Sequence, residues 1–201
     1  MKSAMAVLAL MLVYRCGYVR CATVPQDSTD MLALINFRQA ITGEPRGFFN
    51  SWNNSVDYCN WNGVTCSKTH RGRVRELNLT GGSLEGRISP SLGNLTLLKI
   101  LDLSSNSLSG QLPDLNCLRK LQFLVMSNNK LQHFAPNALT NCSNLLYLDL
   151  SANNLAGSIP LPPRISFLYK LEFLNLQSNH FTGLIPSSLG NITQLEYLYS
   201  T

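Results

Sequence analysis

One stretch in the middle of the chain, LKILDLSSNSLSGQLP at residues 98–113, contains the pattern that decides the fold. Leu101 and Leu103 are separated by one residue, and Asn106 follows three residues after the second of them. Alternating leucines place both side chains on one face of a short strand, because successive side chains of a strand point to opposite faces. The pattern recurs every 23 to 26 residues, and its first leucines are Leu77, Leu101, Leu124, Leu148, Leu174 and Leu198.

This period predicts the architecture. Repeats of about 20–29 residues with this pattern are typical of leucine-rich repeats, in which each unit buries its leucines only against its neighbours. We therefore expect an α/β fold, namely a right-handed leucine-rich-repeat solenoid with a short parallel sheet on its concave face. The expected layout is a signal peptide at 1–22, an N-terminal cap at 27–70, and five repeats plus a partial, truncated sixth at 71–201.

A polar column accompanies the leucines, three residues after the second apolar position of each repeat. The chain turns sharply there, and a buried amide can both donate to and accept from backbone groups that have no sheet partner. We expect these amides to bond neighbouring turns, with the weakest ladder in the first repeat, where glycine replaces asparagine. The column consists of Gly82, Asn106, Asn129, Asn153 and Asn179.

A helical cap is expected ahead of the repeats, over residues 28–42. Asp27, Ser28 and Thr29 are candidate N-cap residues, and Gly43 follows the expected end of the helix. The hydrophobic end of a solenoid must be covered, and this helix would cover it together with nearby aromatic side chains. Those aromatic residues are Phe48, Phe49, Trp52 and Trp61.

The first 22 residues have the features of a secretory signal peptide. Lys2 gives a positive start, and the apolar run at 4–13 is too short to span a bilayer but suits a signal sequence. Cleavage is expected near Cys21 or Ala22, and a buried N-terminal helix is the alternative. Part of the formal charge of +5 belongs to this segment, and no basic run supports a nucleic-acid partner.

The cysteines after the signal segment fall into two groups. Cys59 and Cys66 lie close together in a polar stretch, and a secretory context predicts a disulfide between them. A metal site is the competing interpretation, but no matching Cys/His pair lies nearby. Cys117 and Cys142 occupy nearly equivalent positions in successive repeats. We expect buried free thiols there, although their pairing stays open.

The cap and the repeats together resemble a known family. The sequence DMLALINF at residues 30–37, the pair SW at 51–52 and the run CNWNGVTC at 59–66 are similar to the N-terminal cap of plant leucine-rich-repeat receptor kinases and receptor-like proteins. The Gly-x-Ile-Pro segments resemble the plant-specific repeat class, and LTNCSNL at 139–145 resembles the large grass subfamily of immune-receptor-type kinases. The resemblance covers residues 27–198 and implies an extracellular sensor in defence or developmental signalling.

Departures from this family suggest a fragment or a truncated product. Family members usually carry more repeats, a C-terminal cysteine cap, a membrane span and a kinase domain. Ser200 stands where the second leucine of the sixth repeat is expected, so Leu195 and Leu198 would be exposed at the C-terminal face. Kinase signatures are absent from the sequence, so we expect no enzymatic activity in this chain, although a longer parent could be a serine/threonine kinase.

Five Asn-x-Ser/Thr sequons predict N-linked glycosylation of a secreted chain. Asn78 is the weakest candidate, because it lies on the first strand and a glycan would block that face. The pattern is short and also arises by chance in Asn- and Ser-rich repeats, so we expect ~3 to be used. The candidates are Asn53, Asn78, Asn94, Asn141 and Asn191.

The outward positions of the strands are the candidate ligand face. Stacked repeats would align a largely aromatic row beside a more polar one, which suits peptide binding. Lateral packing between strands is the alternative explanation. The aromatic row contains Ile100, Phe123, Tyr147 and Phe173, between Glu76 and Tyr197, and the polar row contains Asn78, Asp102, Val125, Asp149 and Asn175.

Recognition is therefore the expected function, with a peptide or protein ligand and a co-receptor as partners. His70, His133 and His180 fall at non-equivalent positions and form no evident catalytic or ligand pair. We expect no cofactor, no metal, no nucleic acid, and a membrane link only through a C-terminal part beyond this sequence. The expected location is secreted or on the outer face of the plasma membrane. The alternatives are a secreted inhibitor of a cell-wall-degrading enzyme, a short co-receptor, or the N-terminus of a receptor kinase.

Overall fold

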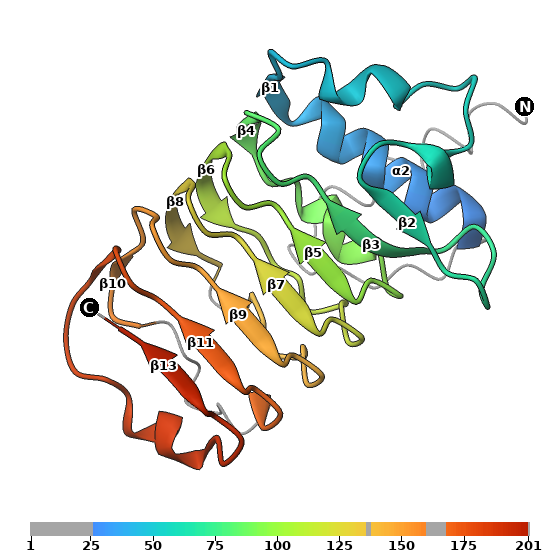
Figure 1. Ribbon diagram of the computed structural model, residues 1–201. Coiled ribbons are helices and arrows are strands. Elements are labelled where there is room, and N and C mark those ends of the chain that lie inside the picture. Colours follow the sequence, from blue (N-terminus) through green and yellow to red (C-terminus); the bar gives the residue numbers. More distant parts are fainter. Residues whose placement is uncertain (1–25, 136–137, 160–167, 201) are drawn as a thin grey trace, which may run out of the picture.

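The computed structural model describes residues 26–135, 138–159 and 168–200. These residues form a right-handed solenoid with a parallel sheet on its concave face, as the period of the leucines predicts (Figure 1). The expected signal peptide at 1–22 lies outside the described residues. Within the described ranges, no helix is long and apolar enough to cross a bilayer.

The concave sheet has seven strands in the described part of the chain, in the order β13-β11-β9-β7-β5-β3-β2. The strands from β3 to β13 are parallel and keep equivalent residues of successive repeats in register, whereas β2 runs antiparallel to β3. The strands are β2 (Val64–Cys66), β3 (Val74–Asn78), β5 (Ile100–Asp102), β7 (Phe123–Val125), β9 (Tyr147–Asp149), β11 (Phe173–Asn175) and β13 (Tyr197–Tyr199).

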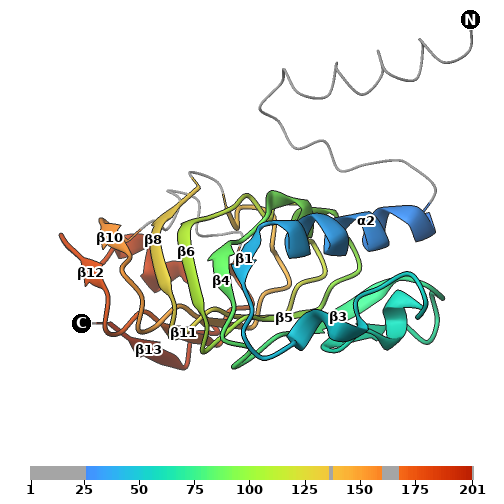
Figure 2. The ribbon, with the colours of Figure 1, turned by 90° about the horizontal axis from the view of Figure 1, so that it is seen from above.

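Further strands run along a different side of the solenoid (Figure 2). In the described residues β4, β6 and β8 pair in parallel, β1 joins β4 antiparallel, and β10 pairs with β12. The sequence does not indicate these two sheets. Backbone pairing between neighbouring repeats holds them, without an alternating apolar pattern in the strands. The strands are β1 (Ile41–Gly43), β4 (Glu85–Arg87), β6 (Ser107–Leu112), β8 (Lys130–Phe134), β10 (Ala156–Gly157) and β12 (His180–Phe181).

The repeat leucines form one continuous core between these layers. Burying a leucine side chain contributes about 1.5–3 kcal/mol, so a stack of them is the main source of stability. Leu198 in β13 is the exception at 40% exposed, and Leu195 is half-buried, as expected at the C-terminal face. The buried first leucines are Leu77, Leu101, Leu124, Leu148 and Leu174.

The asparagine ladder is confirmed. Asn153 donates from Nδ2 to the Met126 carbonyl of the preceding repeat at 2.9 Å, and its Oδ1 accepts the Leu131 N–H at 3.0 Å. The other three asparagines repeat both bonds, so each amide faces the repeat before it. The bonds that Gly82 cannot make are therefore lost at the junction with the cap. A Cβ at Gly82 would lie 3.1 Å from Phe48 of the cap, so the glycine leaves room for that ring.

The cap helix begins earlier and ends earlier than predicted. Helix α2 spans Gln26–Gln39, so Asp27 and Ser28 lie inside it instead of preceding it, and Ile41–Gly43 forms strand β1 instead of a last helical turn. The Arg87 N–H donates to the Ala40 carbonyl at 3.1 Å, so pairing with the second sheet replaces the helix there. The aromatic covering residues Phe49, Trp52 and Trp61 are buried as expected.

A buried ion pair ties the cap helix to the first repeat. Asp30 is fully buried, and its Oδ2 accepts the Arg73 Nε–H at 3.1 Å and the Val74 N–H at 2.8 Å. Arg73 also donates from Nη2 to the Thr96 hydroxyl at 2.8 Å. The sequence places Asp30 in the first turn of a helix but gives no sign of this long-range contact, because its partner lies 43 residues away.

Candidate ligand-binding face

Three rows of outward residues cross the concave sheet, namely an aromatic row, a polar row and an edge row. The aromatic row consists of the residue just before the first leucine of each repeat, and the polar row consists of the residue just after that leucine. Both rows confirm the alignment predicted from the repeats. The aromatic row is Glu76, Ile100, Phe123, Tyr147, Phe173 and Tyr197, and the polar row is Asn78, Asp102, Val125, Asp149, Asn175 and Tyr199.

The rings of the aromatic row contact one another along the sheet. Tyr147 and Phe173 stack with centroids 4.1 Å apart and planes 4° apart. Phe123 and Tyr197 extend the row on either side, each 6.1–6.2 Å from its neighbour in the row. Phe123 is 38% exposed and Tyr197 is 52% exposed. The row therefore both packs laterally and presents apolar surface to solvent.

The polar row holds the turn after each strand. Asp149 Oδ1 accepts the Ser151 N–H at 2.9 Å and the Ser151 hydroxyl at 2.7 Å, and Asp102 binds Ser104 in the same way. Asn78 and Asn175 accept backbone N–H groups two residues on. The sequence indicates these residues as ligand contacts, but the structure gives one oxygen of each a role in the backbone turn.

Tyr147 belongs to the aromatic row and lies near carboxylates of the polar row. Partial burial raises the pKa of its phenol above the usual range, and the neighbouring carboxylates of Asp149 and Asp102 raise it further, followed by Tyr199. The phenol therefore stays neutral at physiological pH and can donate a hydrogen bond to a ligand.

An edge row lies one residue before the aromatic row. Backbone hydrogen bonds of 2.7–2.9 Å run from each residue of this row to the carbonyl of the preceding one. Its charges change sign along the sheet, from basic at β3 and β5 to acidic at β11 and β13. This row is not among the ligand positions predicted from the sequence, although its period is visible in the same repeat. The edge row is Arg75, Lys99, Gln122, Leu146, Glu172 and Glu196.

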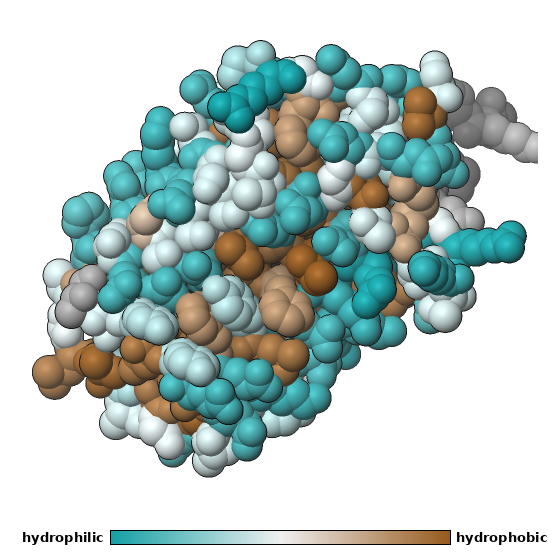
Figure 3. Space-filling view, viewed as in Figure 1, coloured by the Kyte–Doolittle hydropathy of each residue, from teal (hydrophilic) through white to brown (hydrophobic). Residues whose placement is uncertain are grey.

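Apolar surface is concentrated toward the C-terminal end of this face (Figure 3). The side chains of Leu184 and Ile185, in the loop after β12, are 92% and 54% exposed. Tyr199 in β13 is 41% exposed, and its ring lies 5.7 Å from that of Phe173. The candidate face formed by the three rows, which we call the concave strip, therefore ends beside an exposed apolar loop and carries the exposed rings of Tyr197 and Tyr199 at its C-terminal end.

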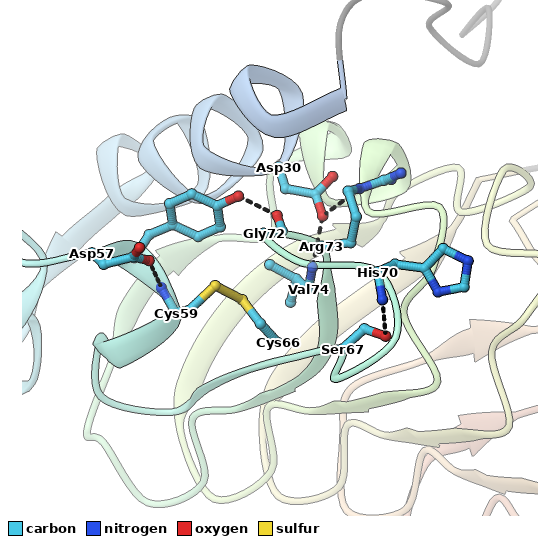
Figure 4. The surroundings of a disulfide bond; sticks show 10 residues. Asp30, Asp57, Cys59, Cys66, Ser67, His70, Gly72, Arg73 and Val74 are labelled. Carbon is cyan, nitrogen blue, oxygen red and sulfur yellow. Dashed lines mark hydrogen bonds and ion pairs between the residues drawn. A yellow bond between two sulfur atoms is a disulfide. The ribbon is translucent and has the colours of Figure 1, made fainter.

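The predicted cap disulfide is present between Cys59 and Cys66, whose Cα atoms are 5.3 Å apart (Figure 4). It joins the 3-10 helix η3 (Tyr58–Asn60) to strand β2, and Asp57 accepts the Cys59 N–H at 2.8 Å. Among the described residues no group of three His, Cys, Asp or Glu side chains could hold a metal ion.

The expectation of two buried free thiols is half wrong. Cys117 is buried but disulfide-bonded in the structure. Cys142 is a buried free thiol whose Sγ donates to the Leu115 carbonyl at 3.6 Å. Burial, followed by the nearby carboxylate of Asp114, raises the pKa of the Cys142 thiol to about 12. Equivalent positions in a repeat therefore do not imply the same chemistry.

The sequons lie on different surfaces. Asn78 is exposed on the concave strip, whereas Asn53 is exposed in the cap and uses its Oδ1 to accept the Ser55 N–H. The other three share one repeat position, seven residues before the first leucine, and so lie along one flank. These are Asn94 and Asn191, each the last residue of a 3-10 helix (η4, Pro90–Asn94, and η6, Ser187–Asn191), and Asn141.

Comparisons with known proteins agree with this architecture. Residues 27–67 match the leucine rich repeat N-terminal domain, and residues 97–117, 120–142, 144–167 and 170–192 match the leucine rich repeat, together more than half of the chain. The LRR receptor-like serine/threonine-protein kinase EFR of Arabidopsis thaliana is 46% identical over 88 residues, which are 43% of this chain and 8% of the kinase. The chain belongs to the plant leucine-rich-repeat receptor family.

Other members of this family have similar sequences and structures. Phytosulfokine receptor 1 of Arabidopsis thaliana is 37% identical over 55% of this chain and 11% of its own length, so the chain spans only a small part of the curated relatives it matches. A chain in the BIR3–SERK2 complex of the same plant gives a TM-score of 0.70 at 33% identity, covering 84% of this chain and 93% of that one.

The same solenoid also occurs outside receptors. A plant ice-binding protein gives a TM-score of 0.76 at 31% identity, covering 86% of this chain and 56% of that one. The fold alone therefore does not determine what this leucine-rich-repeat chain binds.

Proposed function

We propose that the chain is an extracellular recognition module that binds a peptide or protein ligand on the concave strip, as the N-terminal part of a plant receptor kinase or receptor-like protein. The observation that carries this proposal is the row of partly exposed rings from Phe123 to Tyr197, which includes the neutral phenol of Tyr147. Aromatic side chains with adjacent polar groups are the residues that dominate binding energy at protein interfaces.

Similar structures support a peptide or co-receptor as the partner. The Arabidopsis receptor kinase HAESA, in a complex with the peptide hormone IDA and the co-receptor SERK1, gives a TM-score of 0.72 at 32% identity, covering 85% of this chain and 29% of that one. The PEPR1–AtPEP1 complex gives a TM-score of 0.64 at 32% identity. The chain covers only a small part of HAESA. A co-receptor site and a role in defence or developmental signalling are therefore parts of our proposal and are not carried over from that structure.

A selection experiment tests ligand binding by the strip. A phage-displayed library of random peptides is selected on the secreted chain, on the double variant Phe123→Ser with Tyr197→Ser, and on the control Leu184→Ser. Leu184 is 92% exposed and lies outside the strip. We expect peptides that bind the wild type and the control but lose at least tenfold in affinity for the double variant. Equal binding by all three would contradict the proposal, provided thermal unfolding shows that the double variant is folded.

The proposed location has its own test. Expression of residues 1–201 in plant cells should give a secreted product without residues 1–22, and glycosidase treatment should reduce its mass. Replacing Asn94, Asn141 and Asn191 by Gln, singly and together, shows which of the flank sequons carry glycans. Retention inside the cell with an intact N-terminus would contradict the proposed signal peptide.

A further inference from the structure

The concave strip is electrostatically uneven. The nine positions that its three rows take from β9, β11 and β13 include Asp149, Glu172 and Glu196 but no Lys or Arg. The chain as a whole carries a formal charge of +5, so this half of the strip is a local region of opposite sign.

The other half of the strip is balanced. At β3 and β5, Arg75 and Lys99 of the edge row lie beside Glu76 and Asp102 of the two inner rows. From this contrast, and resting on the proposed function, we propose that the peptide ligand places a cationic side chain, an arginine, over strands β9, β11 and β13.

The aromatic rings there offer a second contact for a cation. Tyr147 and Phe173 cover one face of each other, whereas the rings of Tyr197 and Tyr199 are 52% and 41% exposed and are tilted by 42° and 44° against Phe173. A cation within about 6 Å of a ring centroid is attracted by the negative face of the ring. Rings and carboxylates in one place therefore favour a cationic group over a neutral one.

The two edge carboxylates are available to a ligand. Glu172 and Glu196 are exposed, and neither has an ion pair with another described residue. The Glu196 N–H donates to the Glu172 carbonyl at 2.9 Å, so the two residues lie side by side where the adjacent strands β13 and β11 begin. Adjacent strands are about 4.8 Å apart, which lets one side chain approach both carboxylates.

Arginine fits this place better than lysine does. A planar guanidinium presents five donors in a fork that matches carboxylates, and it also stacks on aromatic faces. Lysine offers a compact and strongly hydrated charge that gains less from a ring. We therefore expect arginine to be enriched above lysine in peptides that bind the strip.

The peptide selection on the secreted chain tests the inference. Arginine is expected to be enriched among wild-type binders. Replacing the arginine of a selected peptide by citrulline, which keeps the shape without the charge, should weaken binding about five- to twentyfold in isothermal titration calorimetry. In the double variant Glu172→Gln with Glu196→Gln, which keeps Asp149 and the rings, the ratio of the arginine-peptide to the citrulline-peptide affinity should fall by at least about twofold. The matched control Glu85→Gln, an exposed glutamate on β4 outside the strip, should keep the wild-type difference.

The outcomes separate this inference from the proposed function. Selected peptides that depend on Phe123 and Tyr197 but contain no enriched arginine, or bind equally well with citrulline, would overturn the inference and leave the proposed function in place. An arginine preference that is undiminished in the Glu172→Gln, Glu196→Gln variant would also overturn it. Failure to select any peptide that depends on the strip would overturn the proposed function, and the inference with it.

Discussion

Tyr147 and Phe173 stack face to face across strands β9 and β11, with ring centroids 4.1 Å apart and planes 4° apart. The two rings belong to different repeats and meet only because the repeats are in register. The contact stabilises the sheet, and the exposed neighbours Phe123 and Tyr197 leave apolar surface for a ligand. Lateral packing between strands is therefore observed in this row, and it leaves room for the ligand binding that we propose for the same residues.

Replacing Phe173 by Leu should reveal the packing role. The variant keeps an apolar side chain of smaller area but loses the ring stack, so we expect the free energy of unfolding to fall by about 0.5–1.5 kcal/mol in urea titrations. Tyr147→Phe is the control, since it keeps the stack and should change stability by less than about 0.5 kcal/mol. Equal stability of Phe173→Leu and the wild type would show that the stack contributes nothing to folding.

Loss of an asparagine of the ladder should lower the free energy of unfolding more than loss of the ring stack. Asn153 is buried, and its side chain makes four hydrogen bonds to backbone groups of two repeats. Asn153→Ala leaves the Leu131 N–H and the Met126 carbonyl without this partner, so we expect a loss of about 2–4 kcal/mol in the free energy of unfolding.

The adjacent Asn154 provides a matched control for this change. Its side chain is exposed, so Asn154→Ala should change stability by less than about 0.5 kcal/mol. Similar losses in both variants would mean that general effects of removing an amide, and not the ladder, set the stability.

The features marked by the same residue type in successive repeats are the features that the sequence predicts. Leu101, Leu124 and Asn153 each recur at a fixed offset, so one period is enough to assign a strand, a core position and a buried amide. The alignment of Tyr147 with Phe173 follows from the same period, because parallel strands in register bring equivalent positions together.

Features that occur once are harder to predict. The pairing of Asp30 with Arg73 and the strand Ile41–Gly43 both depend on how the cap lies against the first repeat. A helical apolar pattern continues through Ile41, and only pairing with β4 overrides it. Repeat equivalence also misleads at Cys117 and Cys142, because the bonding of a cysteine depends on its surroundings and not on its column.

The cap disulfide should contribute measurably to stability. The double variant Cys59→Ser with Cys66→Ser removes a short loop closure, for which chain entropy gives about 2–3 kcal/mol. A lower midpoint in urea with an unchanged slope is the expected result. A midpoint equal to that of the wild type would mean that Trp52 and Trp61, which stack in the cap 5.0 Å apart, hold it without the bond.

The buried thiol of Cys142 predicts how stability depends on alkaline pH. Burial raises its pKa from 9.0 to about 12, so between these values the unfolded chain loses a proton that the folded chain keeps. The unfolded state is thereby favoured, and the contribution of this group to stability, complete below pH 9, should fall by about 1.4 kcal/mol per pH unit as the pH rises above it. Urea midpoints measured from pH 8 to 10 should therefore decline less in Cys142→Ala than in the wild type.

In the folded wild type the thiol should also resist iodoacetamide at pH 8.5 and react once urea unfolds the chain. Rapid alkylation of the folded protein, or identical pH profiles for the two proteins, would show that Cys142 is not held as a buried neutral thiol.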